Sequence, residues 1–118
     1  MKKFLAIYLG DQASSKFAEW NALPAAQREA SHKEGAAAWH AWVEKHQRAI
    51  VDGGGPLGKT KTVSAKGIAD IKNQLTGYTI IQAESHEAAA RLFENHPHFS
   101  RMPGDCVEIM EILPIPGM

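Results

Sequence analysis

The sequence GYTIIQA, residues 77–83, begins a segment that continues to Ile115. The pattern of this segment indicates the fold of the chain. This short apolar run is rich in β-branched residues and opens on a glycine, a pattern typical of a strand. Ser85 is suited to cap a following helix, and Glu87 falls in the first turn, where the helix dipole favours a negative charge. Residues 105–113 are typical of a final strand. We therefore expect one strand–helix–strand unit in the last third of the chain.

The helix of this unit carries an apolar face that ends in a histidine. Four residues share that face because they are spaced at i, i+3, i+4 and i+7: Ala89, Leu92, Phe93 and His96. Pro97 disfavours the helical conformation of the residue before it, so the helix is expected to end at His96. His98 follows two residues later. The sequence thus predicts a site at the end of a packed helix, without identifying the molecule that fills it.

The first half of the chain supplies a strand and two helices. Residues 3–9 are apolar on both faces of a predicted strand, which must then be covered on both sides. A short helix carrying Phe17 and Trp20 is expected next. A second helix then runs as far as Val51, interrupted or kinked at Gly35, with Trp39, Trp42, Val43, His46 and Ile50 along one stripe.

The middle of the chain connects these elements to the last unit. Residues 59–63 predict a second strand, residues 65–67 a turn, and residues 68–76 an irregular segment or a short helical turn. The whole order is β-α-β-β-α-β. It predicts an α+β domain of the ferredoxin-like, split βαβ type that spans residues 1–118.

Size and composition exclude several classes of protein. A chain of 118 residues is large enough for one domain and too small for two. Its 13 basic and 13 acidic residues balance, so no basic excess indicates nucleic-acid binding and no charged block indicates a membrane surface. The apolar start after Lys2 and Lys3 is too short for a signal peptide. With a single cysteine, Cys106, we expect a cytoplasmic protein without an internal disulfide.

The first and last strands both predict a partner for the sheet. Along the last strand Val107, Ile109 and Leu113 alternate with Cys106, Met110 and Ile112, so both of its faces are mainly apolar. Two helices can cover only one face of a four-stranded sheet. The simplest cover for the other face is a second copy of the same sheet, so we expect a homodimer.

Five segments share one resemblance to known proteins: GGGPLG at 53–58, QLTGY at 74–78, AAA at 88–90, HPH at 96–98 and VEI at 107–109. Together they make the chain resemble the YCII-related (DGPF-domain) family. That resemblance implies a dimeric α/β-barrel with a pocket between sheet and helices. A few members look like enzymes that act on small hydroxylated aromatics.

The chain departs from the family pattern in two places. KGIAD, residues 66–70, stands where the family has its Asp-Gly-Pro-Phe signature. In family members similar to the founding protein, the site looks to be formed by a histidine of the first helix and an aspartate just before a proline. In this chain the residue before that proline is His96, and the candidate for the first-helix histidine is His40. The family's His–Asp pair therefore does not carry over.

Two other motifs are weaker. GGGPLGKT, residues 53–60, matches the phosphate-loop pattern, but a helix leads into it and the segment that leaves it looks extended, so we interpret it as a glycine-rich turn feeding an edge strand. His96 and His98 could begin a metal site with Cys106, Asp105 or Glu108. Their spacing lacks the clusters typical of such sites, so we expect no metal and no cofactor.

A general acid–base pair is the more attractive chemistry. His96 would be the acid or base and Glu108 its orienting partner, because burial and a neighbouring carboxylate together can hold a histidine pKa near neutrality. The predicted substrate-binding residues are His98, Tyr8, Trp42, His46 and Asp105. The plainer interpretation is that His96 caps its own helix and Glu108 is a charge at the rim.

Two functions remain open at this point. The first is a cofactor-independent enzyme that moves a proton on a small aromatic or carbonyl-bearing metabolite. The second is a non-catalytic binding or regulatory module that acts as a dimer.

Overall fold

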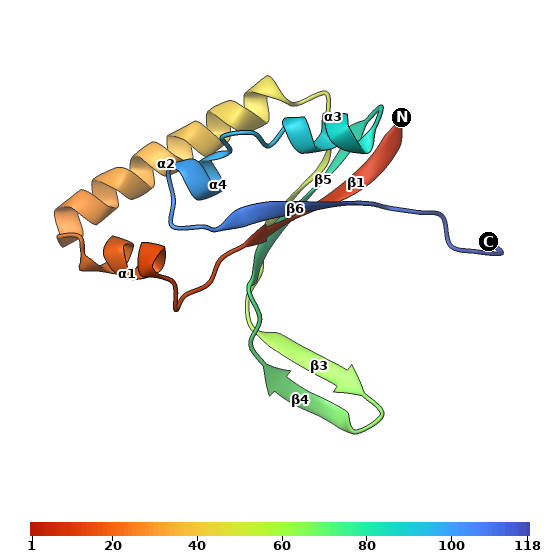
Figure 1. Ribbon diagram of the computed structural model, residues 1–118, viewed down its shortest axis with the longest axis horizontal. Helices are drawn as coiled ribbons and strands as arrows, with labels where there is room; N and C mark the ends of the chain where they lie inside the picture. The colour runs from red at the N-terminus through yellow and green to blue at the C-terminus, as the bar shows by residue number, and fades with distance from the viewer.

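Four antiparallel strands form the central sheet, in the order β2-β5-β1-β6 (Figure 1). The computed structural model describes residues 1–118. The strands of this sheet are β1 (Lys2–Leu9), β2 (Ile50–Pro56), β5 (Leu75–Ala83) and β6 (Cys106–Glu111). A separate hairpin is inserted between β2 and β5 and consists of β3 (Thr60–Ser64) and β4 (Gly67–Ile71). The helices are α1 (Ser15–Ala22), α2 (Ala25–Lys45), α3 (His86–Arg91) and α4 (Pro97–Ser100).

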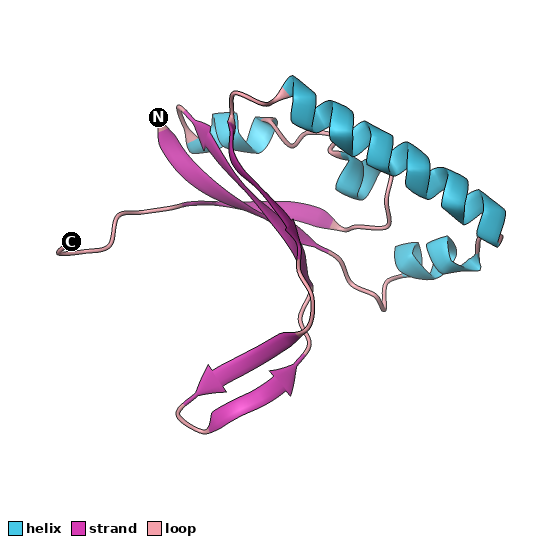
Figure 2. Cartoon of the chain, turned by 180° about the vertical axis from the view of Figure 1, so that it is seen from behind, coloured by secondary structure: helices cyan, strands magenta, loops and turns pink.

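This arrangement confirms the predicted ferredoxin-like α+β fold. Without the hairpin the elements follow the order β-α-β-β-α-β, with two consecutive helices at each helical position, and the first and third of these strands, β1 and β5, lie in the middle. All the helices lie on one side of the sheet, as both views show (Figures 1 and 2). No helix is long and apolar enough to span a bilayer.

The core lies between the sheet and the helices. Along β1 the side chains of Phe4, Ala6 and Tyr8 are buried, whereas the residues between them are only half-buried. Side chains alternate across a strand, so the buried set faces the helices and the other set faces away. The core cluster consists of Phe4, Ala6, Tyr8, Trp42, Ile81, Ala83, Ala89 and Phe93. Burying a side chain such as Phe4 contributes roughly 1.5–3 kcal/mol to folding.

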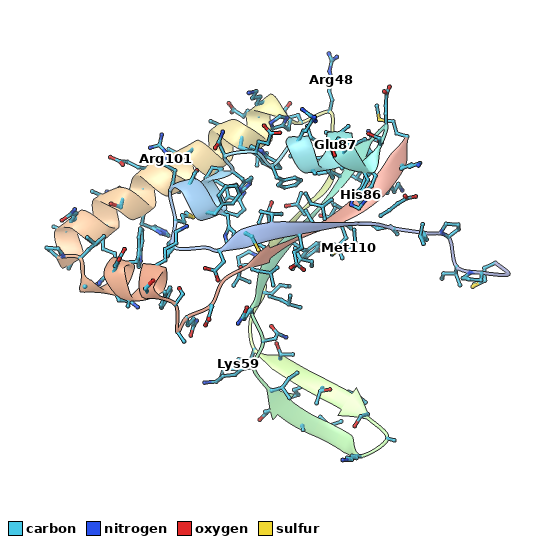
Figure 3. All side chains as sticks on the ribbon, viewed as in Figure 1. Arg48, Lys59, His86, Glu87, Arg101 and Met110 are labelled. Atoms are coloured by element: carbon cyan, nitrogen blue, oxygen red, sulfur yellow. The ribbon has the colours of Figure 1, made fainter.

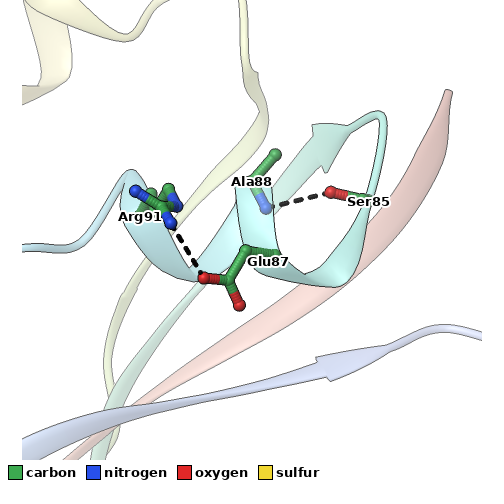
Figure 4. Close-up of polar contacts among 4 residues, drawn as sticks. All are labelled: Ser85, Glu87, Ala88 and Arg91. Atoms are coloured by element: carbon green, nitrogen blue, oxygen red, sulfur yellow. Dashed lines mark hydrogen bonds and ion pairs between the residues drawn. The ribbon is translucent and has the colours of Figure 1, made fainter.

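Local signals explain where α3 begins. The Ser85 hydroxyl accepts a hydrogen bond from the Ala88 N–H at 3.1 Å, which is the predicted cap (Figure 4). One turn further on, Glu87 and Arg91 form an exposed ion pair at 3.1 Å (Figure 4). Such a pair adds only a few tenths of a kcal/mol to the helix.

The end of that helix differs from the prediction. The α3 helix stops at Arg91, and Asn95 adopts a left-handed conformation with φ of 57°. His96 is then the N-cap of α4, and Pro97 is its first residue. Proline suits this position because it has no N–H to leave unpaired and its fixed φ is helical. Pro97 thus begins a helix, although the sequence pattern was equally compatible with its ending one.

Three other segments also differ from the prediction. The long helix passes through Gly35 without a break, and Met102 packs closely against this glycine, where a side chain would be crowded. It ends at Lys45, and the predicted helical residues from Ile50 onward belong to the edge strand β2. Residues 68–71, expected to be irregular or to form a short helical turn, instead continue the strand β4 that begins at Gly67.

The glycine-rich segment lies within the edge strand and not in a loop that opens a helix. Gly54 has a φ of 65°, and the register with β5 shifts between Asp52 and Gly55. A Cβ at Gly54 would collide with the carbonyl of Tyr78. The glycines therefore serve a bulged strand, which accounts for them without a bound phosphate.

Candidate acid–base site

The His98 side chain defines the candidate site. His98 lies in α4 and is 7 % exposed. Its Nε2 atom lies 2.7 Å from the carbonyl oxygen of Leu9, at the end of β1. A carbonyl oxygen can only accept a hydrogen bond, so Nε2 carries the hydrogen. In the neutral ring Nδ1 is then the unprotonated nitrogen, which is the form that a general base requires.

The Nδ1 atom of His98 is free and accessible. His98 makes its hydrogen bonds through Nε2 and through its backbone N–H and C=O groups. The only buried side-chain nitrogen or oxygen without a hydrogen-bond partner is Nε2 of His96. Since His98 Nδ1 has no partner either, it is reached by solvent, and the residue lines a cleft.

Three neighbours set the charge state of His98. Burial lowers the pKa of its imidazole below the ordinary 6.5, the bond to the Leu9 carbonyl raises it, Lys16 lowers it, and Asp105 raises it. The net shift is downward, so the ring is neutral at pH 7 and can accept a proton. Behind it lies Gly104, where any side chain would collide with the imidazole.

The cleft beside His98 has a volume of about 290 Å³. Aromatic side chains of α1, Phe17 and Trp20, form one wall, and His32 of α2 also contributes. The other lining residues are Gly10, Gln12, Thr76, Met102, Pro103 and Gly104. The sequence marked Phe17 and Trp20 only as part of a short helix and did not mark His32, Met102 or Pro103 as site residues.

Lys16 links α1 to two backbone carbonyl groups beside this cleft. Its Nζ donates to the carbonyl oxygens of Phe99 at 2.6 Å and of Gly104 at 2.7 Å. The nearby Asp105 carboxylate accepts the Asp11 N–H at 2.7 Å. Asp105, predicted to bind substrate, is therefore engaged in joining the loop before β6 to the loop after β1.

His96 is sealed inside the core. It is 0 % exposed, and its Nδ1 accepts the backbone N–H of His98 at 3.0 Å. Aromatic rings surround it, with the Trp39 and Trp42 ring centroids 4.5 and 4.6 Å away. Burial, then His98 and His46, lower its pKa to about 3. This neutral, enclosed ring supports α4 and has no route to a ligand.

The other predicted site residues lie behind His96 and away from the cleft. The Tyr8 hydroxyl bonds to Thr79 Oγ1 at 2.7 Å, and burial raises its pKa to about 12 although the Thr79 bond lowers it. The indole N–H of Trp42 donates to the Leu92 carbonyl at 2.8 Å. His46 caps the end of α2, with its ring 5.1 Å from that of Trp42. These side chains pack behind the site and do not line the cleft. Of the predicted site residues, only His98 lines it.

The structure separates the predicted pair of His96 and Glu108. Glu108 is exposed and pairs with Ile7 on the face of the sheet away from the helices. Val107 and Ile109, on either side of it, pack against the core. Alternation along β6 therefore places Glu108 and His96 on opposite faces of the sheet. Hydrogen-bond reach between them is absent within one chain.

A shared metal site is not formed by these residues. No group of three or more histidine, cysteine, aspartate or glutamate side chains is placed to hold one ion. Nδ1 of His96 and Nε2 of His98 already serve hydrogen bonds within the chain.

Comparison with known proteins supports the fold. No family model and no curated protein matches the chain. It is similar to the solved structure of 5-chloro-2-hydroxyhydroquinone dehydrochlorinase (TftG) from Burkholderia phenoliruptrix, determined in complex with 2,5-dihydroxybenzoquinone. The two chains are 21 % identical, with a TM-score of 0.51, over 92 % of this chain and 90 % of the other. This likeness is consistent with a YCII-like α+β fold.

Proposed function

We propose that this protein is a YCII-related, cofactor-independent enzyme that binds a small aromatic or carbonyl-bearing metabolite and moves a proton on it. The observation that carries the proposal is the free Nδ1 of His98 at the cleft, with its Nε2–H held by the Leu9 carbonyl. A general base must be unprotonated, positioned and reachable by the substrate. His98 meets all three requirements.

The proton transfer follows from the tautomer. Nδ1 of His98 takes a proton from an acidic O–H or C–H group of the ligand. The imidazolium that forms keeps its Nε2–H bond to the carbonyl of Leu9, and the Asp105 charge favours it. Positioned acid–base catalysis of this kind contributes about 10²–10⁴-fold to a rate.

The walls of the cleft suit a flat ligand. Phe17 and Trp20 offer aromatic faces against which a ring can stack. The similar dehydrochlorinase was solved with a small hydroxylated quinone bound, which is a ligand of this shape.

The oligomer that we propose is a homodimer in the cytoplasm. The face of the sheet away from the helices carries Leu5, Ile7, Ile80 and Met110. Met110 is 40 % exposed there, and Val51 on the edge strand is 45 % exposed. A second copy that covers this face would bury its apolar side chains.

The test compares His98→Gln with a matched control, His86→Gln. The amide of the introduced glutamine can still donate to the Leu9 carbonyl, but it has no basic nitrogen at the position of Nδ1. The control is apt because His86 Nε2 also contacts a backbone carbonyl, that of Ile109, at 2.7 Å. The measurement is solvent deuterium uptake, followed by NMR, into hydroxylated quinones and β-dicarbonyl compounds.

The expected result is that His98→Gln binds the same compounds but exchanges protons at least about 10²-fold more slowly than wild type. The His86→Gln rate should equal that of wild type. Equal rates in all three proteins would contradict the role of His98. Binding without exchange in any of them would favour the non-catalytic binding module.

A further inference from the structure

The hairpin of β3 and β4 projects from the body of the molecule. In both views it extends from the ends of β2 and β5 and turns away from the helices (Figures 1 and 2). Its two strands pack chiefly on each other. A two-stranded hairpin without further packing is marginally stable in water. The arm, defined here as residues 57–74, therefore lacks the contact that would normally hold such an element.

The arm carries an apolar pair that nothing in its own chain covers. Val63 and Ile68 lie directly opposite each other across the two strands. They are 76 % and 72 % exposed. Cross-strand pairs of β-branched residues stabilise a sheet when they pack against a surface, so this pair indicates a missing partner.

The arm is also basic, whereas the rest of the chain is not. Four lysines against the single Asp70 give it a net charge of +3: Lys59, Lys61, Lys66 and Lys72. Lys59 extends from the root of the hairpin (Figure 3). Residues 75–118 hold two arginines against six carboxylates, a net charge of −4. A basic arm favours contact with a surface that carries a carboxylate.

The uncovered face of the sheet carries one of these six carboxylates. Glu108 lies on that face between Cys106 and Met110, and Met110 is visible on β6 in Figure 3. The hairpin turns toward the side that this face presents and away from the helices (Figures 1 and 2). A second copy seated on the face would therefore lie alongside the arm.

We infer that the hairpin is an arm that docks on a second copy of this chain, with Val63 and Ile68 on the partner's uncovered sheet face and the lysines near Glu108 of that face. This inference rests on the homodimer of the proposed function and adds the element that holds it together. In a two-fold dimer the contact occurs twice, once from each copy. A nucleic acid would engage the lysines but would leave the Val63–Ile68 pair uncovered, so the second copy fits both features.

The first experiment measures the dimer dissociation constant by analytical ultracentrifugation. One variant, Val63→Ser/Ile68→Ser, removes the apolar pair, and another, Lys59→Glu/Lys66→Glu/Lys72→Glu, reverses the charge of the arm. Both should raise the dissociation constant by about tenfold or more. Lys33→Glu, an exposed lysine of α2 on the helix side, is the control and should leave the constant unchanged. Circular dichroism checks that each variant is folded.

The second experiment identifies the contact. A mixture of ¹⁵N-labelled and unlabelled protein is treated with a zero-length carbodiimide cross-linker, and mixed-isotope peptides report links between copies. We expect arm lysines joined to Glu108 of the other copy. A wild-type monomer would overturn the homodimer and the arm together. A dimer whose dissociation constant is unchanged in both arm variants, with no mixed-isotope link to the arm, would overturn the arm alone.

Discussion

His96 and His98 are two residues apart, yet they lie in regions of opposite character. The region around His96 is a closed aromatic core in which the ring has no contact with solvent. The region around His98 is a cleft that this residue lines, and its Nδ1 makes no hydrogen bond within the chain. The first histidine aligns the second, because His96 Nδ1 accepts the His98 backbone N–H. The comparison of the two histidines indicates that a buried histidine can position a site residue without taking part in the chemistry of the site.

The largest expected effect comes from breaking the closed region. His96→Ala removes a fully buried ring and leaves the His98 N–H without its acceptor. We expect a loss of about 3 kcal/mol in the free energy of unfolding, as in other large-to-small core substitutions. His96→Asn keeps a side-chain acceptor at the cap and should recover about 1 kcal/mol of that loss. Urea denaturation measures both, and equal stability of the two variants would contradict the capping role.

A substitution behind His98 tests the open region. Gly104→Ala places a Cβ where the imidazole now lies, so the ring must move. We expect a cost of about 1–3 kcal/mol, typical of overpacking, together with loss of ligand binding. Gly58→Ala is the control, because nothing lies within 4 Å of a Cβ there. Thermal unfolding and calorimetric titration with a hydroxylated quinone measure the two effects. Unimpaired binding in Gly104→Ala would show that the position of the ring does not matter.

Acidification should distinguish the two regions next. The pKa of His96 is lowered to about 3 in the folded chain, so between pH 6.5 and 3 the unfolded chain binds the extra proton. The contribution of the neutral His96 ring to the free energy of unfolding is fully present above pH 6.5. As the pH decreases below 6.5, the free energy of unfolding falls by about 1.4 kcal/mol per pH unit. His96→Asn should show a correspondingly shallower slope in denaturation series at several pH values. Parallel slopes would mean that His96 is not held neutral.

The smallest expected effect concerns Lys16, which links α1 to residues beside the cleft. Lys16→Met removes the two hydrogen bonds that join α1 to Phe99 and Gly104. Because the ammonium is exposed, we expect only about 1 kcal/mol in stability but a several-fold weaker ligand affinity. Lys33→Met serves as the control. Ligand affinity is measured by quenching of tryptophan fluorescence, to which Trp20 in the cleft wall contributes. An unchanged affinity would show that the Lys16 hydrogen bonds do not contribute to ligand binding.

Much of the fold followed from local pattern. Short apolar runs at residues 3–9 and 77–83 predicted the strands β1 and β5, and the Ser85 cap was identified from residue type alone. Pro97 misled because proline suits the first turn of a helix as well as the position after one. The left-handed Asn95 that separates α3 from α4 left no distinctive pattern in the sequence.

The site was less predictable because it depends on which face of each element meets which neighbour. Alternation along β6 grouped Glu108 with Met110, but it could not tell which face the helices would cover. Helical spacing placed His96 inward, and the distinction between a sealed core and an open cleft requires tertiary packing. Phe17 and Trp20 sit on a short helix with no buried residue, so periodicity gave no reason to assign them to a cleft.

The protonation states of His96 and His98 can be measured directly by NMR titration of the imidazole nitrogens in uniformly ¹⁵N-labelled protein. His96→Asn and His98→Gln assign the signals. We expect both rings to be neutral at pH 7 with hydrogen on Nε2, and the His98 pKa to lie below 6.5. Adding a ligand should shift the His98 Nδ1 signal, while His96 stays neutral down to about pH 4. A His98 ring with hydrogen on Nδ1, or a ligand that shifts His96 and leaves His98 unchanged, would contradict the role of His98 as the base.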